Sequence, residues 1–254
     1  MSRREPLSVT VITLNEEREL GRCLDSVTWA EEIVVVDSGS TDRTREIARA
    51  CGARVVHRDW TSYLDQKNHA IDLARHRWIL SLDADEWLTP EGAAEVRAVL
   101  ANPRAAGYAF NRRSSFCGAF LERAWNPDWQ LRLFDRACGR FAGGRVHESV
   151  AMRRGDRVLR LRQRLPHIAY RTVDEYVERI NRYTGLAAET LAERGKRVSW
   201  IRLLFAPAAT FLKILLLKGG LLDGTRGFVV AVGSAFYVVL KYLKLWDRTR
   251  QDHE

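Results

Sequence analysis

Short apolar runs alternate with segments of helical spacing along the first hundred residues. Residues 7–14 form a nearly unbroken apolar and β-branched run, and residues 33–36 repeat the pattern. Such runs are typical of parallel strands that are buried on both faces. Between them, Leu20, Cys23 and Leu24 recur at helical spacing, which predicts the crossover helix that a parallel strand pair requires. The chain is therefore expected to begin with a β-α-β unit.

The alternation continues as far as residue 100. A third strand is expected at residues 55–56, a helix over residues 62–75 and a fourth strand over residues 78–82. Thr89 and Pro90 then provide an N-cap and a first-turn proline for another helix. This order predicts an α/β fold with a doubly wound, mostly parallel sheet, whose ligands bind beyond the carboxyl ends of the strands.

Acidic residues follow two of the expected strands. Asp37 ends the second strand, and Asp83-Ala-Asp85 ends the fourth. Two carboxylates at this spacing can project together toward one Mg²⁺ or Mn²⁺ ion, which readily bridges carboxylate to diphosphate. Asp37 would accept a hydrogen bond from the imide N–H of uracil, and Ser40 or Thr41 is expected to cap the following helix. A DxD pair alone is a weak signal, but its place after a buried strand predicts a metal and nucleotide site.

The composition fits one folded domain with an appended segment. The 254 residues can bury one sizeable core, and the hydrophobic fraction of 46% is that of a folded chain. The net charge of +9 favours an anionic partner, namely nucleic acid, a phosphorylated substrate or an acidic membrane surface. The basic residues are dispersed and no recognised nucleic-acid-binding motif is present, which disfavours nucleic acid. The four cysteines lack metal or disulfide spacing and the N-terminus is no signal peptide, so a cytoplasmic location is expected.

The second half of the chain changes character. Short strands are expected at residues 108–112 and 131–134, where they would complete the sheet. Residues 172–175 fit a capping box that begins an amphipathic helix ending near Gly195.

Residues 200–246 are the most apolar part of the chain. Their longest uncharged stretch, residues 227–240, has fourteen residues, whereas a membrane span takes about 20. Basic side chains punctuate the region, as in helices that lie in the lipid interface. These are Arg202, Lys213, Lys218, Arg226, Lys241 and Lys244. We expect peripheral association with an anionic membrane surface, and the alternative is an ordinary helical bundle packed on the catalytic domain.

Four sequence stretches, taken in order, resemble one enzyme family. They are SVTVITLNEE at residues 8–17, IVVVDSGSTDRT at 33–44, QKNHAIDLA at 66–74 and WILSLDADEWL at 78–88. Together they are similar to family 2 glycosyltransferases of the GT-A fold, strongly over residues 7–100 and moderately to about residue 150. Within that family the chain resembles lipopolysaccharide core β-glucosyltransferases, chiefly through DSGSTD, QLRLF at 130–134, Val146-His147-Glu148 and the C-terminal LLDGTRG.

The resemblance implies a domain division and a donor site. A GT-A catalytic domain would occupy residues 1–165, with a nucleotide-sugar half at about 7–100 and an acceptor side at about 101–165, and an amphipathic helical region would occupy 166–254. Ser38 stands where the family's DDxS motif has its second aspartate. The implied roles are uridine binding for Thr13, Asn15, Glu16 and Asp37, proximity to the donor for Lys67 and Asn68, a ribose or metal-water contact for Asp83, and metal ligation for Asp85.

The family's inverting reaction is a single displacement. A general base takes the proton of the acceptor hydroxyl as the nucleoside diphosphate leaves, and metal charge stabilises the leaving group. The base should be a carboxylate on the acceptor side of the site. Glu148, in Arg145-Val-His147-Glu148, is favoured, and Asp128, in Pro127-Asp-Trp-Gln, is the second candidate.

Four further side chains have two interpretations each. His147 would be a metal ligand or orient Glu148, although a lone histidine more often makes a structural hydrogen bond. Arg132 would bind diphosphate oxygens in bidentate geometry or form a surface ion pair. Trp125 and Trp129 would stack on a sugar face or fill the core.

The expected function is transfer of a hexose, glucose by resemblance, from a UDP-sugar to a lipid-linked glycan of the lipopolysaccharide inner core. Two alternatives stay open. A polyprenyl-phosphate glycosyltransferase would share every donor residue named. A catalytically inactive scaffold that binds sugar nucleotides is disfavoured by the intact Asp83 and Asp85.

Overall fold

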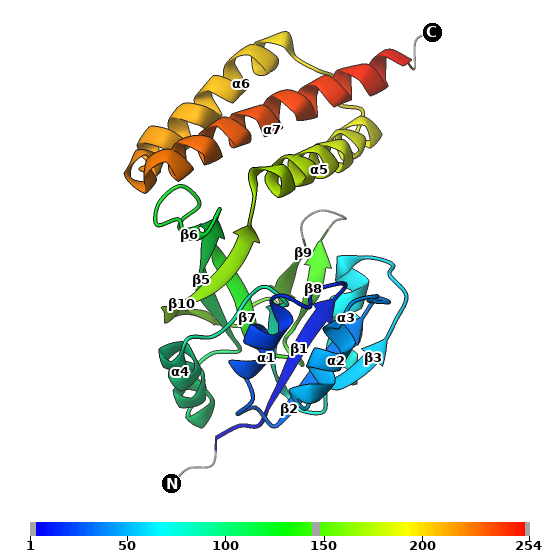
Figure 1. Ribbon diagram of the computed structural model, residues 1–254, viewed down its shortest axis with the longest axis vertical. Coiled ribbons are helices and arrows are strands. Elements are labelled where there is room, and N and C mark those ends of the chain that lie inside the picture. Colours follow the sequence, from blue (N-terminus) through cyan, green and yellow to red (C-terminus); the bar gives the residue numbers. More distant parts are fainter. Residues whose placement is uncertain (1–3, 144–147, 252–254) are drawn as a thin grey trace. The chain divides into compact units, whose positions relative to one another are not determined.

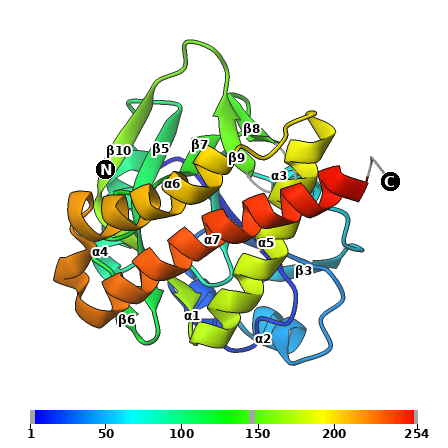
Figure 2. The ribbon, with the colours of Figure 1, turned by 90° about the horizontal axis from the view of Figure 1, so that it is seen from above.

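A computed structural model describes residues 4–143 and 148–251 of the chain (Figure 1). The chain forms two compact units. The first comprises Met1–Arg113 and Asp128–His167, and the second comprises Ser114–Pro127 and Ile168–Glu254. The second unit contains the helices α5 (Val173–Glu193), α6 (Trp200–Leu212) and α7 (Gly224–Gln251) (Figure 2). Residues 114–127, expected on the acceptor side of the catalytic domain, group with these C-terminal helices.

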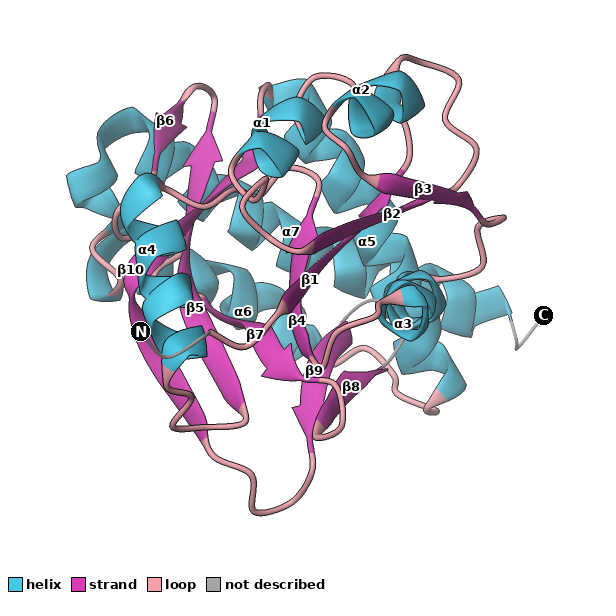
Figure 3. Ribbon diagram, turned by 90° about the horizontal axis from the view of Figure 1, so that it is seen from below, coloured by secondary structure: helices cyan, strands magenta, loops and turns pink. Residues whose placement is uncertain are grey.

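The first unit is built on a mixed sheet with the strand order β10-β5-β7-β4-β1-β2-β3 (Figure 3). The parallel part consists of β1 (Leu7–Thr13), β2 (Glu32–Asp37), β3 (Arg54–His57) and β4 (Trp78–Asp83). The rest consists of β5 (Gly107–Phe116), β7 (Trp129–Asp135) and β10 (Val158–Tyr170). The short β6 (Ala119–Phe120) pairs with Ser115 and Phe116 at the end of β5, within the second unit. β7 runs antiparallel to both β4 and β5. The expected α/β fold with a mostly parallel sheet is confirmed.

Helices cover both faces of this sheet, which explains why the first strands are continuously apolar. One face packs against α1 (Leu20–Asp25), α2 (Thr44–Ala50) and α4 (Pro90–Ala101). The other face packs against α3 (Tyr63–Leu73) and the hairpin of β8 (Gly139–Gly143) and β9 (Glu148–Met152). On β2, Val35 lies in the first core and Val34 and Val36 lie in the second, and all three are fully buried.

Helix starts follow the sequence with one exception. The Ser62 and Thr89 hydroxyls cap α3 and α4, each accepting a backbone N–H bond of 3.1 Å. The expectation that Ser40 or Thr41 caps α2 was wrong, because α2 begins after Arg43 without a side-chain cap. The Ser40 hydroxyl bonds to Asp37 instead.

The second unit is held together by the packing of α7 against α5 and α6 (Figure 2). A Cβ atom at Gly233 would lie 2.2 Å from Cε1 of Tyr176, so only glycine lets α7 approach α5 this closely. The shared core contains Phe116, Leu121, Tyr176, Ile180 and Val230. Thr172 caps α5 by accepting the Glu175 N–H at 3.1 Å, as the capping box predicts.

Asp223 fixes the segment between β6 and β7 to the helices of the same unit. Its carboxylate accepts the backbone N–H groups of Glu122, Arg123 and Ala124 at 2.9, 3.0 and 2.8 Å. Arg226, three residues later in the LLDGTRG stretch, donates to the Cys117 carbonyl at 3.1 Å. Asp223 and Arg226 of the LLDGTRG stretch therefore bind the segment around residues 117–124, which lies about a hundred residues earlier in the sequence.

Two helical stretches of the second unit, Trp200–Leu217 and Gly220–Arg250, are long and apolar enough to cross a membrane by length and composition. Their apolar windows are 0% and 17% buried within the protein. Both stretches are longer than the uncharged run of fourteen residues at 227–240. The helices continue through isolated basic residues that end the uncharged run. Length and composition alone are a weak indication of a membrane span.

Candidate functional site

The two acidic strand ends lie at the same edge of the sheet. β1 lies between β2 and β4, and its register places Thr13 beside Asp37 and Ile12 beside Asp83. Because all three strands are parallel, their carboxyl ends meet at this edge, where α/β sheets bind their ligands. The predicted acidic residues are therefore gathered rather than scattered.

Asp37 is completely buried in its own turn. Its carboxylate accepts the backbone N–H groups of Gly39 and Ser40 at 3.2 and 3.1 Å, together with the Ser40 hydroxyl. The Ser40 oxygen also accepts the Asn15 N–H at 2.8 Å, and the Asn15 side chain accepts the Thr41 N–H at 2.8 Å. Asn15 adopts a left-handed conformation with φ of 56°, which asparagine tolerates better than most residues. These bonds hold the loops after β1 and β2 in one arrangement.

Thr13 and Glu16 belong to the same pair of loops. The Glu16 N–H donates to the Thr44 hydroxyl at 2.8 Å, and the Thr13 carbonyl accepts the Ser38 N–H at 3.0 Å. The Thr13 hydroxyl is buried and has no hydrogen-bond partner among the residues that the structure describes. A buried hydroxyl without a partner is uncommon, so this atom suits a polar ligand atom at the strand end.

Lys67 connects Asp83 to Glu148. The Nζ atom of Lys67, on α3, lies 2.9 Å from Oδ1 of Asp83 and 3.0 Å from Oε1 of Glu148. The next residue, Asn68, donates to the Phe141 carbonyl at 3.0 Å and accepts the Phe141 N–H at 3.1 Å. Asn68 thus binds β8 rather than an open site, and its contact holds the β8–β9 hairpin where Glu148 meets Lys67.

A second line of ion pairs joins Asp83 to Asp128. Nη2 of Arg132 lies 2.5 Å from Oδ2 of Asp83 and 2.6 Å from Oε1 of Glu86. Arg112 lies 3.4 Å from the same Glu86 oxygen and 2.8 Å from Oδ2 of Asp128. Arg132 is only 4% exposed, so it does not form the surface ion pair that was one interpretation. Both carboxylates considered as the base therefore belong to one continuous chain of charges.

The buried charges of this chain alter the pKa values of its members. Burial raises the pKa of the Asp83 carboxyl, but the positive charges of Arg132 and Lys67 outweigh burial and hold that pKa well below its usual range. Burial lowers the pKa of Arg132, and Asp83 and Glu86 reverse this and raise it. Burial, with repulsion from Glu86 and Asp85, raises the pKa of the nearby Cys23 thiol. Asp83 and Arg132 are therefore charged at neutral pH, and Cys23 is a neutral thiol.

Asp85 lies in the turn after β4 and is the residue best placed to hold a metal ion. Its Oδ1 atom is buried without a hydrogen-bond partner among the described residues, and Oδ2 lies 3.4 Å from Nε2 of His167 on β10. Carboxylate and imidazole are both ligands of Mn²⁺-type cations. Among residues 4–143 and 148–251, no three acidic, His or Cys side chains form a ready metal cluster. His147, the histidine predicted as a ligand, lies outside the described residues.

A model of glycosyl transferase family 2 matches residues 8–157, more than half of the chain. The chain belongs to this family. Lipopolysaccharide core biosynthesis glycosyltransferase LpsC of Rhizobium meliloti (strain 1021) is 31% identical over 251 residues, covering 96% of this chain and 93% of LpsC. An uncharacterized glycosyltransferase of Rickettsia typhi (strain ATCC VR-144 / Wilmington) is 30% identical over 94% of this chain and 86% of its own length.

One solved structure shares the fold over almost the whole glycosyltransferase. It is a mannosyltransferase from Pyrobaculum calidifontis in complex with GDP-Man and Mn²⁺, with a TM-score of 0.58 and 17% identity. The match covers 97% of this chain and 89% of the mannosyltransferase. At this identity the likeness shows the fold alone.

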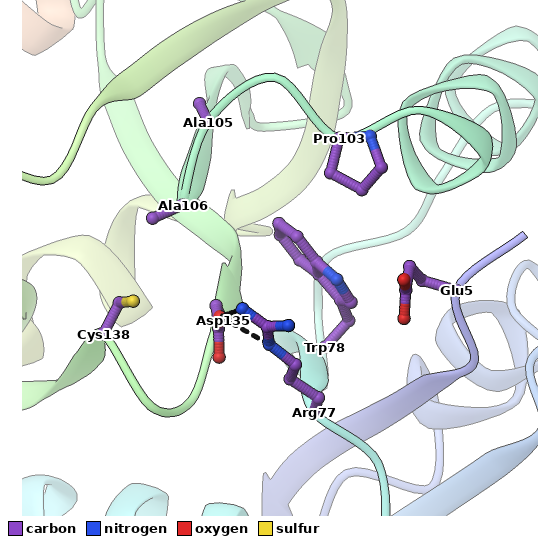
Figure 4. A pocket seen from close by; sticks show the side chains of 8 residues that line it. All are labelled: Glu5, Arg77, Trp78, Pro103, Ala105, Ala106, Asp135 and Cys138. Carbon is purple, nitrogen blue, oxygen red and sulfur yellow. Dashed lines mark hydrogen bonds and ion pairs between the residues drawn. The ribbon is translucent and has the colours of Figure 1, made fainter.

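A cavity of about 380 Å³ lies away from these residues (Figure 4). Its lining includes Trp78 at the start of β4 and the ion pair of Arg77 with Asp135. The cavity therefore lies at the edge of the sheet where the parallel strand β4 begins. Asp83 ends β4 at the opposite edge. The cavity contains none of the predicted site residues of the glycosyltransferase.

The two tryptophans predicted near the acceptor differ in their surroundings. Trp125 packs against Phe116, Tyr170 and Tyr176 in the second unit, with ring centroids 5.7 to 6.2 Å apart, and so helps to fill a core. Trp129 is half-buried on β7 and lies 4.5 Å below the guanidinium of Arg160.

Three residues of the site had no role assigned from the sequence. Glu86 is fully buried and anchors both Arg132 and Arg112, and the only signal for it was its place directly after the DxD pair. Arg112 and His167 lie in strands without any recognisable motif. Their proximity to the acidic residues arises only when β5 and β10 join the sheet.

Proposed function

We propose that this glycosyltransferase moves a hexose, glucose in the first instance, from a UDP-sugar to a lipid-linked glycan of the lipopolysaccharide inner core, with inversion and with Mg²⁺ or Mn²⁺. The observation that carries the proposal is the chain of ion pairs from Glu148 through Lys67, Asp83 and Arg132 toward Asp128. It joins the donor-side carboxylate to both candidate bases at the edge of the sheet where ligands bind. The name of the relative LpsC supports the choice of acceptor pathway.

The charge balance of the site favours a divalent cation. Five carboxylates, those of Asp83, Asp85, Glu86, Asp128 and Glu148, face three cations, those of Lys67, Arg112 and Arg132. Asp85 and His167, with Asp83 beside them, would hold the metal ion. When bound, Mg²⁺ or Mn²⁺ supplies positive charge to the departing diphosphate.

The remaining roles follow from the contacts of each side chain. Glu148 would accept the proton of the acceptor hydroxyl, and Lys67, whose Nζ atom lies 3.0 Å from Oε1 of Glu148, would hold that carboxylate in position. Arg132 still has a buried Nε–H without a partner among the described residues, which would be available to a diphosphate oxygen. The loops carrying Asn15 and Asp37 would bind the uridine, with the Thr13 hydroxyl free to meet it.

The proposal extends to location, at the cytoplasmic face of the inner membrane. Several large apolar side chains of α6 and of the turns after it are between 62% and 85% exposed. They are Trp200, Ile201, Leu204, Phe205, Leu217, Leu221 and Leu222. An exposed apolar surface of this size, bordered by Lys213 and Lys218, suits a bilayer of anionic lipid.

A donor screen tests the proposed activity. UDP-glucose with Mn²⁺ should raise the melting temperature of the purified protein more than either component alone, because a ligand that binds only the native state stabilises it. GDP-mannose, the nucleotide sugar bound by the mannosyltransferase from Pyrobaculum calidifontis, serves as the competing donor. Transfer is then measured to core-truncated lipopolysaccharide and to polyprenyl phosphate. Transfer to polyprenyl phosphate alone would contradict the proposed acceptor, and donor binding without transfer to either would favour a scaffold.

Vesicle sedimentation tests the proposed location. The full-length protein should sediment with phosphatidylglycerol vesicles, and Leu217→Glu with Leu222→Glu should weaken this binding. Release of the protein at alkaline pH would indicate peripheral association, whereas retention would indicate that the helices span the bilayer. If the full-length protein never sediments with the vesicles, the membrane location is wrong.

A further inference from the structure

Basic charge is concentrated in one short part of the first unit. Residues 153–164 contain six arginines against a single aspartate, a net charge of +5, whereas the whole chain carries +9. The expectation that the basic residues are dispersed is therefore wrong for this segment. Its second half is the strand β10, which has no lysine and whose charged residues are all arginines.

Three of these arginines form a row on one face of β10. Arg160, Arg162 and Arg164 are exposed. Leu161, between the first two arginines, and Leu165, after the third, are buried in the core. Alternate residues of a strand point to the same face and lie about 7 Å apart. The row is therefore a line of guanidinium groups on the face of β10 opposite the core that packs against α1, α2 and α4. β10 itself is the outer strand of the sheet (Figure 3).

Protection of the sheet edge does not account for the row. Basic side chains on an edge strand often prevent pairing with another chain. On β10 that task is performed by Glu95 of α4, whose carboxylate accepts the backbone N–H groups of Arg162 and Gln163, both at 2.9 Å. Within residues 4–143 and 148–251, no carboxylate forms an ion pair with the side chains of Arg160 or Arg162. Two strong cations are thus left available to an external anion.

The row begins beside Trp129, which follows the candidate base Asp128 in the sequence. The Arg160 guanidinium lies 4.5 Å from the ring centroid of Trp129, the residue that follows Asp128. Stacking on an aromatic ring fixes the plane of a guanidinium without using its N–H donors. Arg160 is therefore held against Trp129 while its N–H donors stay available for an anion.

We propose that Arg160 and Arg162, continued by Arg164, bind phosphate or carboxylate groups of the glycan acceptor. The inference rests on the proposed function and specifies its acceptor as an anionic saccharide. Guanidinium groups bind both kinds of anion in bidentate geometry. The guanidinium groups of the row repeat about every 7 Å. This spacing suits anionic groups carried on successive sugar residues better than it suits a single small ion. The arginines act by positioning the acceptor and not in the chemical step.

The test compares two doubly substituted full-length proteins. The ladder variant carries Arg160→Gln and Arg162→Gln, and the control carries Arg49→Gln and Arg104→Gln, which remove the same charge from exposed positions elsewhere in the first unit. The probes are a lipid-free phosphorylated core oligosaccharide, the same oligosaccharide after dephosphorylation, phosphatidylglycerol vesicles and UDP. Binding is measured by titration calorimetry for the soluble probes and by sedimentation for the vesicles.

The expected result is selective. The Kd of the ladder variant for the phosphorylated oligosaccharide should rise about tenfold, the control should change less than twofold, and UDP binding should be the same in both. Equal Kd values in ladder and control variants, or no binding of the oligosaccharide to the unaltered protein, would overturn the proposal. A defect confined to vesicles would overturn the proposal and assign the arginines to lipid headgroups. An equal defect with the dephosphorylated glycan would support recognition of its carboxylate groups rather than its phosphates. If the proposed glycosyl transfer is wrong, the unaltered protein should fail to bind a UDP-sugar. The oligosaccharide titration does not depend on that binding, so the two failures can be distinguished.

Discussion

The ammonium group of Lys67 lies 3.0 Å from a carboxylate oxygen of Glu148, although 81 residues separate them. The same ammonium group contacts Asp83 at 2.9 Å and is almost fully buried. Lys67 thus fixes the distance between the carboxylate that ends β4 and the favoured base. Removal of the lysine charge would leave two carboxylates facing each other in a partly buried site.

Glu148→Gln should abolish turnover while the donor still binds. Glutamine keeps the size of the side chain and an oxygen that can accept from Lys67, but it cannot take up a proton. We expect a fall in kcat of about 10²- to 10⁴-fold with a nearly unchanged Kd for UDP. Asp128→Asn is the matched comparison. An active Glu148→Gln protein beside an inactive Asp128→Asn protein would move the base to Asp128.

Asp85→Asn should weaken metal binding directly. The substitution replaces the carboxylate whose Oδ1 atom is buried without a partner among the described residues by a weaker, neutral ligand. Mn²⁺ affinity, followed by electron paramagnetic resonance of the free ion, should fall at least about tenfold, and His167→Asn should act in the same direction. Asp247→Asn, at an exposed position of α7, serves as the control. Full Mn²⁺ affinity in the Asp85→Asn protein would refute the metal site.

The stability of the protein should fall in acid because of Asp83. Arg132 and Lys67 hold the pKa of Asp83 below its unfolded value of about 4. A carboxyl whose folded pKa is lowered stabilises the native state above the unfolded pKa, and this stabilisation is lost as the pH falls below it. The free energy of unfolding in urea should therefore decline below about pH 4 less steeply in Asp83→Asn than in the unaltered protein.

The same variant should be less stable at neutral pH. Removing the Asp83 charge leaves Arg132 and Lys67 short of a buried partner, which costs about 3 kcal/mol. If the free energy of unfolding falls equally in the variant and the unaltered protein from pH 7 to pH 3, Arg132 and Lys67 do not lower the pKa of Asp83.

Asp223→Ala should loosen the segment between β6 and β7. The substitution removes the acceptor of three backbone N–H groups, and bonds to a charged group contribute about 2 kcal/mol each when well formed. Hydrogen exchange of the Glu122, Arg123 and Ala124 amides should accelerate at least about tenfold, with a lower melting temperature. Asp247→Ala should leave these amides unchanged. Equal exchange in both variants would mean that the Asp223 contact is not formed in solution.

The fold of residues 7–100 was predictable because its signals are local. Continuous apolar runs mark β1, β2 and β4, and the hydroxyls of Ser62 and Thr89 mark the starts of α3 and α4. The placement of Asp37 and Asp83 at one edge follows from parallel pairing alone. The cap of α2 was mispredicted because Ser40 has a stronger partner in the buried Asp37 carboxylate, which the sequence does not reveal.

The ion-pair chain was not predictable, since it depends on contacts between distant strands. Asp85 and His167 are 82 residues apart, and Arg112 and Asp128 meet only through the pairing of β5 with β7. Motif spacing indicates which residues end a strand but not which strand lies beside it. Likewise, no local pattern shows that residues 114–127 belong with the C-terminal helices.

The division of the second unit between two chain segments decides how this enzyme can be shortened or recombined. Phe116 and Leu121 come from the segment inside the glycosyltransferase sequence, and their packing partners Ile180 and Val230 come from the C-terminal helices. A chain cut after β10 would expose these side chains to water and invite aggregation. Exchange of the second unit between relatives therefore requires that residues 114–127 and the C-terminal helices be transplanted together.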